Sequence, residues 1–380
     1  MRIPPAAALL SVVLACSGVT RERDAVVEIR DAPGFPRPLA SAWIADAGAD
    51  AEPVASPALR VFPRLGSPDD DEAPPAGPGI VLDGGFDAPV VRRWMHDTSA
   101  RGVAGRGDVV VLTAYPSDAS TGWLSAAPFA SVQTVAIGDG ATADDLVLAA
   151  RVARRAEIVW LTGGDQAKYV RWKGTPLMAA VQGVHDRGGV VGGASAGMIV
   201  LGASVNDALQ TLSENITTPV ALADPYDARI HFTQRVLDLG LLGRTITDPH
   251  FSAKDRMGRL AAFMARQIAD GFAAPDVLGI GVDDGAAFVI DAHGEGRRLA
   301  SGAGPGVFLV KGGAPDRATS GAPLVYGSLE VVKLADDTHA WDLGRRCGRG
   351  LVRTIAIDGA KVPPYPADVY AGGALGSTCP

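Results

Sequence analysis

From residue 79 onward, short apolar runs alternate with segments of helical periodicity, and this alternation restricts the fold more than any other feature of the chain. The runs contain few polar positions, which is typical of strands buried on both faces. Buried strands that alternate with helices predict an α/β fold, with a mostly parallel sheet and helices on both faces. The strands expected first are 80–82, 108–113, 132–137, 158–161 and 190–192. The helices expected with them are 87–101, 142–154, 175–187 and 196–203.

Further along the chain, one more helix and several shorter strands are expected. The helix is 254–269, and the strands are 277–282, 286–290, 306–310 and 329–334. At 380 residues and 47% apolar composition, the chain is long enough for one large core or two smaller ones.

The charge of the chain excludes one class of partner. Its formal net charge is −7, and it contains no long block of Lys and Arg to neutralise phosphates, so we expect no nucleic-acid partner. We therefore expect small molecules or peptides as partners. No metal or cofactor is implied, and a homodimer is left open.

The first 16 residues resemble a targeting segment. One positive charge, Arg2, precedes an apolar run at 6–15, which is too short to span a bilayer as a helix. Val13, Leu14, Ala15 and Cys16 resemble a bacterial lipobox, in which the cysteine is lipidated. We therefore expect a bacterial protein that is exported and either anchored to the cell envelope through lipid on Cys16 or extracellular. Ordinary secretion and a wrong start residue are the alternatives.

Two stretches flank the region of alternating strands and helices. Residues 17–78 are rich in Ala, Pro, Asp and Gly and predict a tether, with one short strand near 59–62. At the other end, 336–380 is expected as a C-terminal extension of the domain formed by 79–335. Cys347 and Cys379 lie at no metal-like spacing, so in an oxidising compartment they could pair, and two unpaired thiols are an equal alternative.

The most specific local motif is Gly-Ala-Ser-Ala-Gly at 193–197, directly after an expected buried strand. This GxSxG pattern is typical of a sharp strand-to-helix turn that exposes a strained nucleophilic serine, here Ser195. The Ala196 amide, at the start of the expected helix, is the natural donor to an oxyanion. A small-residue packing turn is the alternative interpretation.

A serine nucleophile needs a base, and the six histidines are not equally suited to that role. Only His250 follows the end of an expected strand within a polar cluster, 248–252. We therefore predict His250 as the base. The acid that orients it should also follow a strand, and Asp283, Asp284 and Asp248 are the candidates.

A second glycine-containing loop, 162–166, leaves another buried strand at the edge expected to hold Ser195. Paired glycines let a backbone approach a ligand closely, so the Gly164 amide is predicted as the second oxyanion donor. Gln166 would direct a neutral amide at the substrate. A simple turn is the alternative.

These residues together resemble the cyanophycinases, in the peptidase group that also contains the aspartyl dipeptidases. Four motifs carry the resemblance, which covers about 79–335: Thr-Gly-Gly-Asp-Gln at 162–166, Gly-Ala-Ser-Ala-Gly at 193–197, Asp-Pro-His-Phe at 248–251 and Gly-Ile-Gly-Val-Asp-Asp at 279–284. The chain departs from the usual pattern at Pro249, where the family has Gln, and at Asp284, where it has Glu.

The resemblance implies a fold similar to the class I glutamine amidotransferases, which is a flavodoxin-like three-layer sandwich. It implies a serine peptidase domain with Ser195, His250 and Asp284 as the triad. It also implies a substrate pocket shaped by Gln166 and by the polar and basic residues around His250, which are Asp248, Lys254, Arg256 and Arg259. The implied partner is a peptide or poly-amino-acid substrate, and the implied reaction cuts the polyaspartate backbone of cyanophycin and releases β-Asp-Arg dipeptides.

Three alternative functions stay open. One is an Asp-specific dipeptidase or isopeptidase with the same triad, and another is a lipoprotein that keeps the fold and only binds a ligand. An esterase of the α/β-hydrolase type fits less well, because its acid usually precedes its histidine in the chain. For the basic residues near His250, a solvated helix face is the alternative to substrate binding.

Overall fold

The computed structural model describes residues 52–86 and 88–380, so Cys16 and its lipobox lie outside the described residues. Within this part of the chain, sixteen strands form one hydrogen-bonded sheet. They are β1 (Leu59–Val61), β2 (Leu65–Gly66), β3 (Gly79–Asp83), β4 (Asp108–Thr113), β5 (Ser131–Ile137), β6 (Ile158–Leu161), β7 (Val190–Ala194), β10 (Thr245–Asp248), β11 (Leu278–Val282), β12 (Ala286–Ile290), β13 (Glu295–Ala300), β14 (Val307–Lys311), β15 (Val325–Leu334), β16 (Ala340–Asp342), β17 (Cys347–Asp358) and β18 (Ala374–Ser377). A separate two-stranded sheet contains β8 (Ser204–Asn206) and β9 (Phe232–Gln234).

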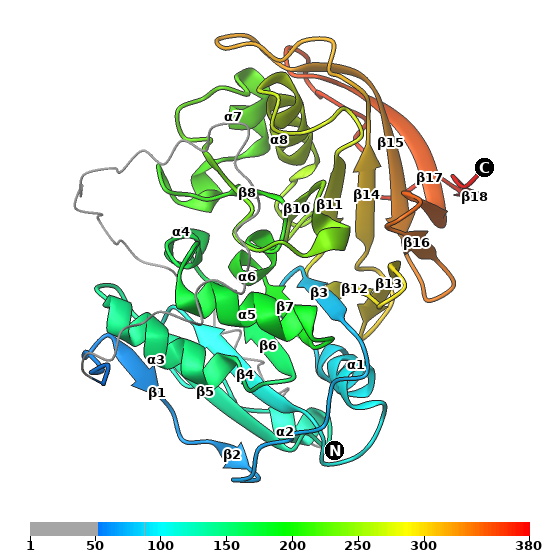
Figure 1. The fold of residues 1–380 in the computed structure, drawn as a ribbon. Coiled ribbons are helices and arrows are strands. Elements are labelled where there is room, and N and C mark those ends of the chain that lie inside the picture. The colour runs from blue at the N-terminus through cyan, green and yellow to red at the C-terminus, as the bar shows by residue number, and fades with distance from the viewer. Residues whose placement is uncertain (1–51, 87) are drawn as a thin grey trace, which may run out of the picture. The chain divides into compact units, whose positions relative to one another are not determined.

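Along the chain, helices alternate with the strands of the N-terminal half, as the sequence predicts (Figure 1). They are α1 (Pro89–Ala100), α2 (Trp123–Ala126), α3 (Ala143–Ala153), α4 (Gln166–Val170), α5 (Pro176–Asp186), α6 (Ala196–Ile199), α7 (Thr218–Ala223) and α8 (Met257–Ala269), with short 3-10 turns at Ser213–Asn215 and Gly240–Leu242. No helix in the described part of the chain is both long enough and apolar enough to cross a bilayer.

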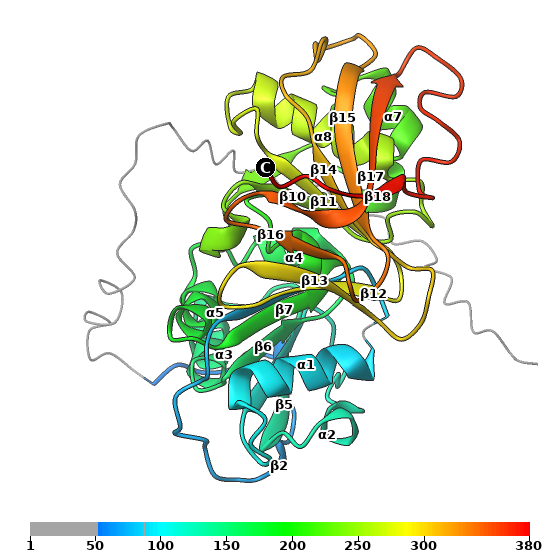
Figure 2. The ribbon, with the colours of Figure 1, turned by 90° about the vertical axis from the view of Figure 1, so that its right-hand side faces the viewer.

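The N-terminal half of the sheet has the predicted parallel layout. Strands β5, β4, β6, β7 and β3 are neighbours in this order and run parallel. Side chains alternate between the two faces of each strand, so Ile80 and Leu82 join one apolar cluster while Val81 joins another. The first cluster includes residues of α3 and α5, and the second includes residues of α1 and α2, so helices cover both faces (Figure 2).

Beyond β3, the expectation of a mostly parallel sheet is wrong. Strand β12 pairs antiparallel with β3, and the sheet continues through β13, β16, β17, β15 and β14 to β11 with antiparallel pairing at every step. Only β10 and β11, at the far end, are again parallel. Short turns in place of crossover helices join β12 to β13 and β16 to β17, and such turns produce antiparallel neighbours. The fold is therefore a mixed α/β arrangement around one large sheet.

Three further expectations change in detail. Helix α6 ends at Ile199 instead of 203, and the chain continues in a turn in which the Leu201 amide donates to the Met198 carbonyl oxygen, 3.1 Å away. From Glu52 onward, the expected tether packs on the sheet, because β1 and β2 both pair with β5. At the other end, β16, β17 and β18 continue the same sheet, and a disulfide joins Cys347 to Cys379.

Candidate active site

Ser195 lies in a strained turn between β7 and α6. Its φ of 51° and ψ of −112° fall in a region that residues with side chains rarely adopt. The glycines on either side permit this turn, because a Cβ on Gly193 would lie 2.5 Å from the Gly197 carbonyl carbon and a Cβ on Gly197 would overlap the Leu161 carbonyl. The GxSxG sequence therefore forms the sharp turn that it predicts.

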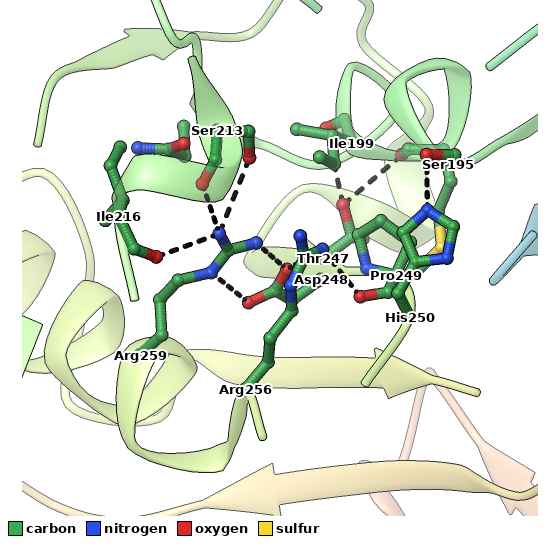
Figure 3. Close-up of polar contacts among 12 residues, drawn as sticks. Ser195, Ile199, Ser213, Ile216, Thr247, Asp248, Pro249, His250, Arg256 and Arg259 are labelled. Atoms are coloured by element: carbon green, nitrogen blue, oxygen red, sulfur yellow. Dashed lines mark hydrogen bonds and ion pairs between the residues drawn. The ribbon is translucent and has the colours of Figure 1, made fainter. Parts of the chain in front are cut away.

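His250 lies two residues beyond the end of β10, and its imidazole reaches Ser195. The distance from His250 Nε2 to Ser195 Oγ is 2.8 Å (Figure 3). On the other side of the ring, Nδ1 contacts the Asp284 carboxylate. An ionised carboxylate only accepts hydrogen bonds, so the ring proton belongs on Nδ1 and Nε2 is free to accept the serine proton. The three side chains form one continuous chain of hydrogen bonds.

The other two candidates for the orienting acid have different partners. Asp283 is buried, and its carboxylate accepts from the main-chain amides of Ser252 and Gly306, each at 2.8 Å. It therefore fixes the loop after His250 to the turn before β14. Asp248 is also buried, and it pairs with two arginines of the following segment. Asp284 is the candidate that the structure brings to the imidazole.

Asp248, Arg256 and Arg259 form an internal ion-pair cluster beside His250 (Figure 3). The Arg259 Nε donates to Asp248 Oδ2 at 2.9 Å, and its Nη1 donates to the carbonyl oxygens of Ser213 and Ile216. The Arg256 Nη1 donates to the Pro249 carbonyl oxygen at 2.7 Å, and burial with the neighbouring Arg259 lowers the Arg256 pKa to about 10.

This burial argues against the expectation that these three residues bind substrate. Asp248 and Arg259 are 1% and 2% exposed, and the hydrogen bonds of all three are directed to one another and to the main chain. Their spacing on the sequence is typical both of a substrate-binding face and of an internal cluster, and only the packing distinguishes the two. They hold the segment that follows His250 in place.

Lys254, the fourth residue expected to bind substrate with them, is exposed. It lies in the loop between His250 and α8. Partial desolvation and the nearby Arg256 lower the Lys254 pKa, and the Asp284 carboxylate acts in the opposite direction. Of the basic residues predicted from this segment, Lys254 alone keeps a side chain open to solvent.

The loop at 162–166 lies next to the serine, as its position after β6 predicts. A Cβ on Gly163 would lie 3.3 Å from the Ser195 Cβ and 3.9 Å from its Oγ. The next residue, Gly164, has φ +136°, and a side chain there would overlap the Tyr115 ring. Glycine at 163 thus lets the backbone lie close to the serine, whereas 164 requires glycine because of its positive φ and the Tyr115 ring.

Gln166 is buried at the start of α4, and its side-chain amide donates to the Asn206 carbonyl oxygen at 3.1 Å. This contact joins the 162–166 loop to β8. The oxyanion roles of Gly164 and Ala196, and the substrate role of Gln166, stay predictions.

One group of site residues was not predicted from the sequence, namely the 83–85 segment at the end of β3. Its three carbonyl groups accept hydrogen bonds from three parts of the site: Asp83 from the Ser195 amide, Gly84 from the His250 amide and Gly85 from the Gly285 amide, each at 3.0 Å. The segment thus holds the main chain of the serine, the histidine and the residue after Asp284 in one framework.

Gly85 also lies directly against the histidine and the aspartate. Its φ is +139°, and a Cβ at this position would lie 2.6 Å from His250 Cε1 and 2.8 Å from Asp284 Oδ1. A signal for this segment was present in the sequence, because Asp-Gly-Gly at 83–85 ends a buried strand just as Thr-Gly-Gly at 162–164 does.

Among residues 52–86 and 88–380, no group of three or more His, Cys, Asp or Glu side chains is arranged to hold a metal ion. The chemistry that the arrangement offers through its own side chains is proton transfer from a serine hydroxyl to an imidazole, with a carboxylate to stabilise the imidazolium.

The fold and the site thus define a mixed α/β protein with a Ser-His-Asp constellation at the carboxyl edge of a sheet. The chain matches no protein-family model. It is 28% identical to the cyanophycinase of Synechococcus elongatus over 173 residues, which are 45% of this chain and 47% of that protein. It is 32% identical to the cyanophycinase of Trichormus variabilis over 139 residues, which are 36% and 40% of the two chains.

These similarities confirm the resemblance to the cyanophycinases that the four motifs predict. The chain spans about half the length of the curated relatives it matches. Among solved structures, a peptidase from an acI-B1 Actinobacterium aligns with 62% of this chain and 91% of its own, at a TM-score of 0.43 and 14% identity.

Proposed function

We propose that this chain is a serine-type peptidase, with Ser195 as nucleophile, His250 as general base and acid, and Asp284 as the residue that orients the histidine. The observation that carries the proposal is the contact of the His250 imidazole with the Ser195 hydroxyl on one side and the Asp284 carboxylate on the other. The strained φ of Ser195 supports it, because strain of this kind is typical of an exposed nucleophile.

The proposed reaction is acyl transfer to water in two steps. Ser195 Oγ attacks the scissile carbonyl carbon while His250 Nε2 takes its proton, and the C–N bond then breaks as the imidazolium returns that proton to the leaving amine. Water repeats the attack on the acyl-enzyme with the same proton transfers, which frees the carboxylic acid and Ser195. In both steps the amides of Gly164 and Ala196 are proposed to stabilise the oxyanion.

We propose the polyaspartate backbone of cyanophycin as the substrate and β-Asp-Arg dipeptides as the products. The similarity to proteins named cyanophycinase supports this substrate. Lys254, exposed in the loop after His250, is the cation proposed to bind a substrate carboxylate, together with the Gln166 loop. An Asp-specific dipeptidase or isopeptidase would use the same triad, and we keep it as the second candidate.

The similarity to proteins named cyanophycinase also supports a more specific fold assignment. We propose that the parallel strands β5, β4, β6, β7 and β3 with their covering helices correspond to the class I glutamine amidotransferase layout, to which the antiparallel strands are added. A solved structure of this chain, superposed on that class over the parallel strands alone, tests the correspondence.

The enzyme proposal is tested by labelling with a fluorophosphonate probe, followed by product analysis. We expect the wild-type protein to be labelled and to release β-Asp-Arg from cyanophycin, and Ser195→Ala to lose both properties while it stays folded. Hydrolysis only of α- or β-linked Asp dipeptides would select the second candidate. A folded wild-type protein that is neither labelled nor active would leave the ligand-binding alternative.

We also propose that the protein is exported and lipid-anchored through Cys16. The paired Cys347 and Cys379 support export, because disulfides persist in oxidising compartments. Incorporation of labelled palmitate that disappears in Cys16→Ala would support the anchor. Recovery of an unlabelled wild-type protein from the cytosol would contradict both export and the anchor.

A further inference from the structure

The C-terminal loop, residues 347–379, is closed on itself by the Cys347–Cys379 disulfide. It begins with β17, leaves the sheet, and returns through β18, which pairs with β17 (Figure 2). Between these two strands it carries Tyr365, which is 9% exposed, and Tyr370, which is half-buried. Both tyrosines contact residues near the proposed catalytic histidine.

Asp255 receives hydrogen bonds from both tyrosines. The Tyr365 hydroxyl donates to Asp255 Oδ1 at 2.7 Å, and the Tyr370 hydroxyl donates to the same oxygen at 2.9 Å. Burial and the adjacent Asp255 carboxylate raise the pKa of Tyr365, so its hydroxyl keeps the donating proton throughout the neutral range. Hydrogen bonds from neutral donors to a carboxylate are stronger than those between neutral groups.

Tyr370 also fixes the start of α8 and the aromatic core beside it. Its hydroxyl oxygen accepts from the Met257 amide at 2.9 Å, so this group both donates and accepts. Its ring packs edge-on against Phe251 and Phe308, each with centroids 5.8 Å apart. Phe251 directly follows His250 in the chain, so the tyrosine contacts both ends of the segment that begins with the histidine.

That segment, residues 250–256, has a backbone that needs support. His250 and Asp255 have φ of 50° and 47°, conformations that cost a non-glycine residue on the order of 1 kcal/mol each. Internal hydrogen bonds close the segment, from the Lys254 amide to the His250 carbonyl oxygen and from the Arg256 amide to the Phe251 carbonyl oxygen. Strained segments persist only where surrounding contacts fix them, and the two tyrosines supply such contacts from outside the segment.

We propose that Tyr365 and Tyr370 are positioning residues for His250, and that the disulfide-closed C-terminal loop is the element that presents them. The part of this inference that concerns reaction rate rests on the proposed peptidase function. The C-terminal loop lies outside residues 162–284, which contain the four motifs that resemble the cyanophycinases.

The test compares Tyr365→Phe/Tyr370→Phe with Tyr226→Phe. The double variant keeps both rings and removes only the hydroxyl groups that contact Asp255 and Met257. Tyr226 is a matched control, because its hydroxyl donates to the Asp270 carboxylate at 2.7 Å at a position outside the 250–256 segment. We expect the double variant to lose about tenfold in kcat with KM changed less than twofold, since misplaced reacting groups slow the chemical step. The control should keep wild-type values.

A second measurement separates this inference from the peptidase proposal. Hydrogen exchange of peptides that cover 250–257 reports the order of the segment without any substrate. We expect faster exchange there in the double variant and in Cys347→Ser/Cys379→Ser, and unchanged exchange in Tyr226→Phe. If the wild-type protein cleaves no substrate, the peptidase proposal fails and the exchange data still test the inference.

Two results would overturn the inference. One is wild-type exchange across 250–257 in the double variant, which would show that the tyrosines do not order the segment. The other is an equal loss of kcat in Tyr226→Phe, which would show a general effect of losing a tyrosine hydroxyl.

Discussion

At the scale of single residues, Gly85 is the position where the smallest change should have the largest effect on the site. A methyl group there would overlap both the imidazole of His250 and the carboxylate of Asp284. The same residue accepts the Gly285 amide through its carbonyl oxygen, so its backbone cannot shift without moving the loop that carries the aspartate.

We therefore expect Gly85→Ala to lower kcat about 100-fold in the proposed hydrolysis of cyanophycin, because displacement of reacting groups by about 1 Å costs on this order. Gly285→Ala is the matched control. Gly285 also has positive φ, +75°, but a Cβ there meets only Pro305 Cγ at 3.7 Å. A loss in the control as large as in Gly85→Ala would assign the effect to backbone strain instead of displacement of the histidine.

At the scale of elements, β10, the loop after it and α8 are joined by the buried cluster of Asp248, Arg256 and Arg259. Strand β10 is also tied to α6, because the Thr247 hydroxyl donates to the carbonyl oxygens of Met198 and Ile199 at 3.2 and 3.3 Å (Figure 3). The elements on either side of His250 are thus fixed by polar contacts in the interior.

Removal of one member of a buried ion cluster leaves uncompensated charge, so we expect Asp248→Ala to lower the free energy of unfolding by about 3–5 kcal/mol. The exposed pair of Glu295 and Arg297 provides the control, since Glu295→Ala should cost less than about 1 kcal/mol. Urea unfolding followed by circular dichroism measures both changes. Unchanged stability of Asp248→Ala, with a raised KM, would restore the substrate-binding role predicted from the sequence.

The bounds of some strands could be predicted from the sequence, whereas those of two helices could not. Strands β4, β6 and β12 have the predicted bounds, because each is a fully buried run with a clear apolar pattern. Helix α6 is shorter than predicted, and the Met198 and Ile199 carbonyl oxygens at its end accept both from main-chain amides two positions or more further on and from Thr247, a residue distant in sequence. Helix α8 begins at Met257 instead of 254 because the loop before it turns at Asp255.

For the site, the predicted Ser195, His250 and Asp284 lie together, because each follows a strand end that a local motif marks. The carbonyl contacts of 83–85 and the burial of Asp248 could not be predicted in this way, since they depend on which strands become neighbours.

At the scale of the whole molecule, a buried carboxyl at the edge of the sheet opposite Ser195 should make stability depend on pH. Glu157 precedes β6, is 6% exposed, and accepts the Asp108 amide at 2.8 Å. Burial, with the charges of Asp108 and Asp71, raises the Glu157 pKa to about 7 from an ordinary value of 4.5, and the Arg187 charge only partly opposes this.

Because the folded state binds the Glu157 proton more tightly than the unfolded state, the stabilising effect is complete below pH 4.5 and is lost as pH rises through 7. The loss has an upper bound of about 3 kcal/mol. We expect Glu157→Gln to unfold in urea with a flatter dependence between pH 5 and about 8, since Gln keeps an acceptor for the Asp108 amide and does not titrate. An unchanged slope in the variant would contradict the assignment of this titration to Glu157.

The contacts of the 83–85 segment have a consequence for how the protein is made. The three carbonyl groups belong to residues 83–85. The amides that donate hydrogen bonds to them belong to residues more than a hundred positions further along the chain. The serine, histidine and aspartate can therefore be aligned only after residue 285 has emerged from the ribosome and the distant segments have met. A nascent chain of this protein would have no assembled triad during most of its synthesis, and alignment of the triad would be among the slow, late steps of folding.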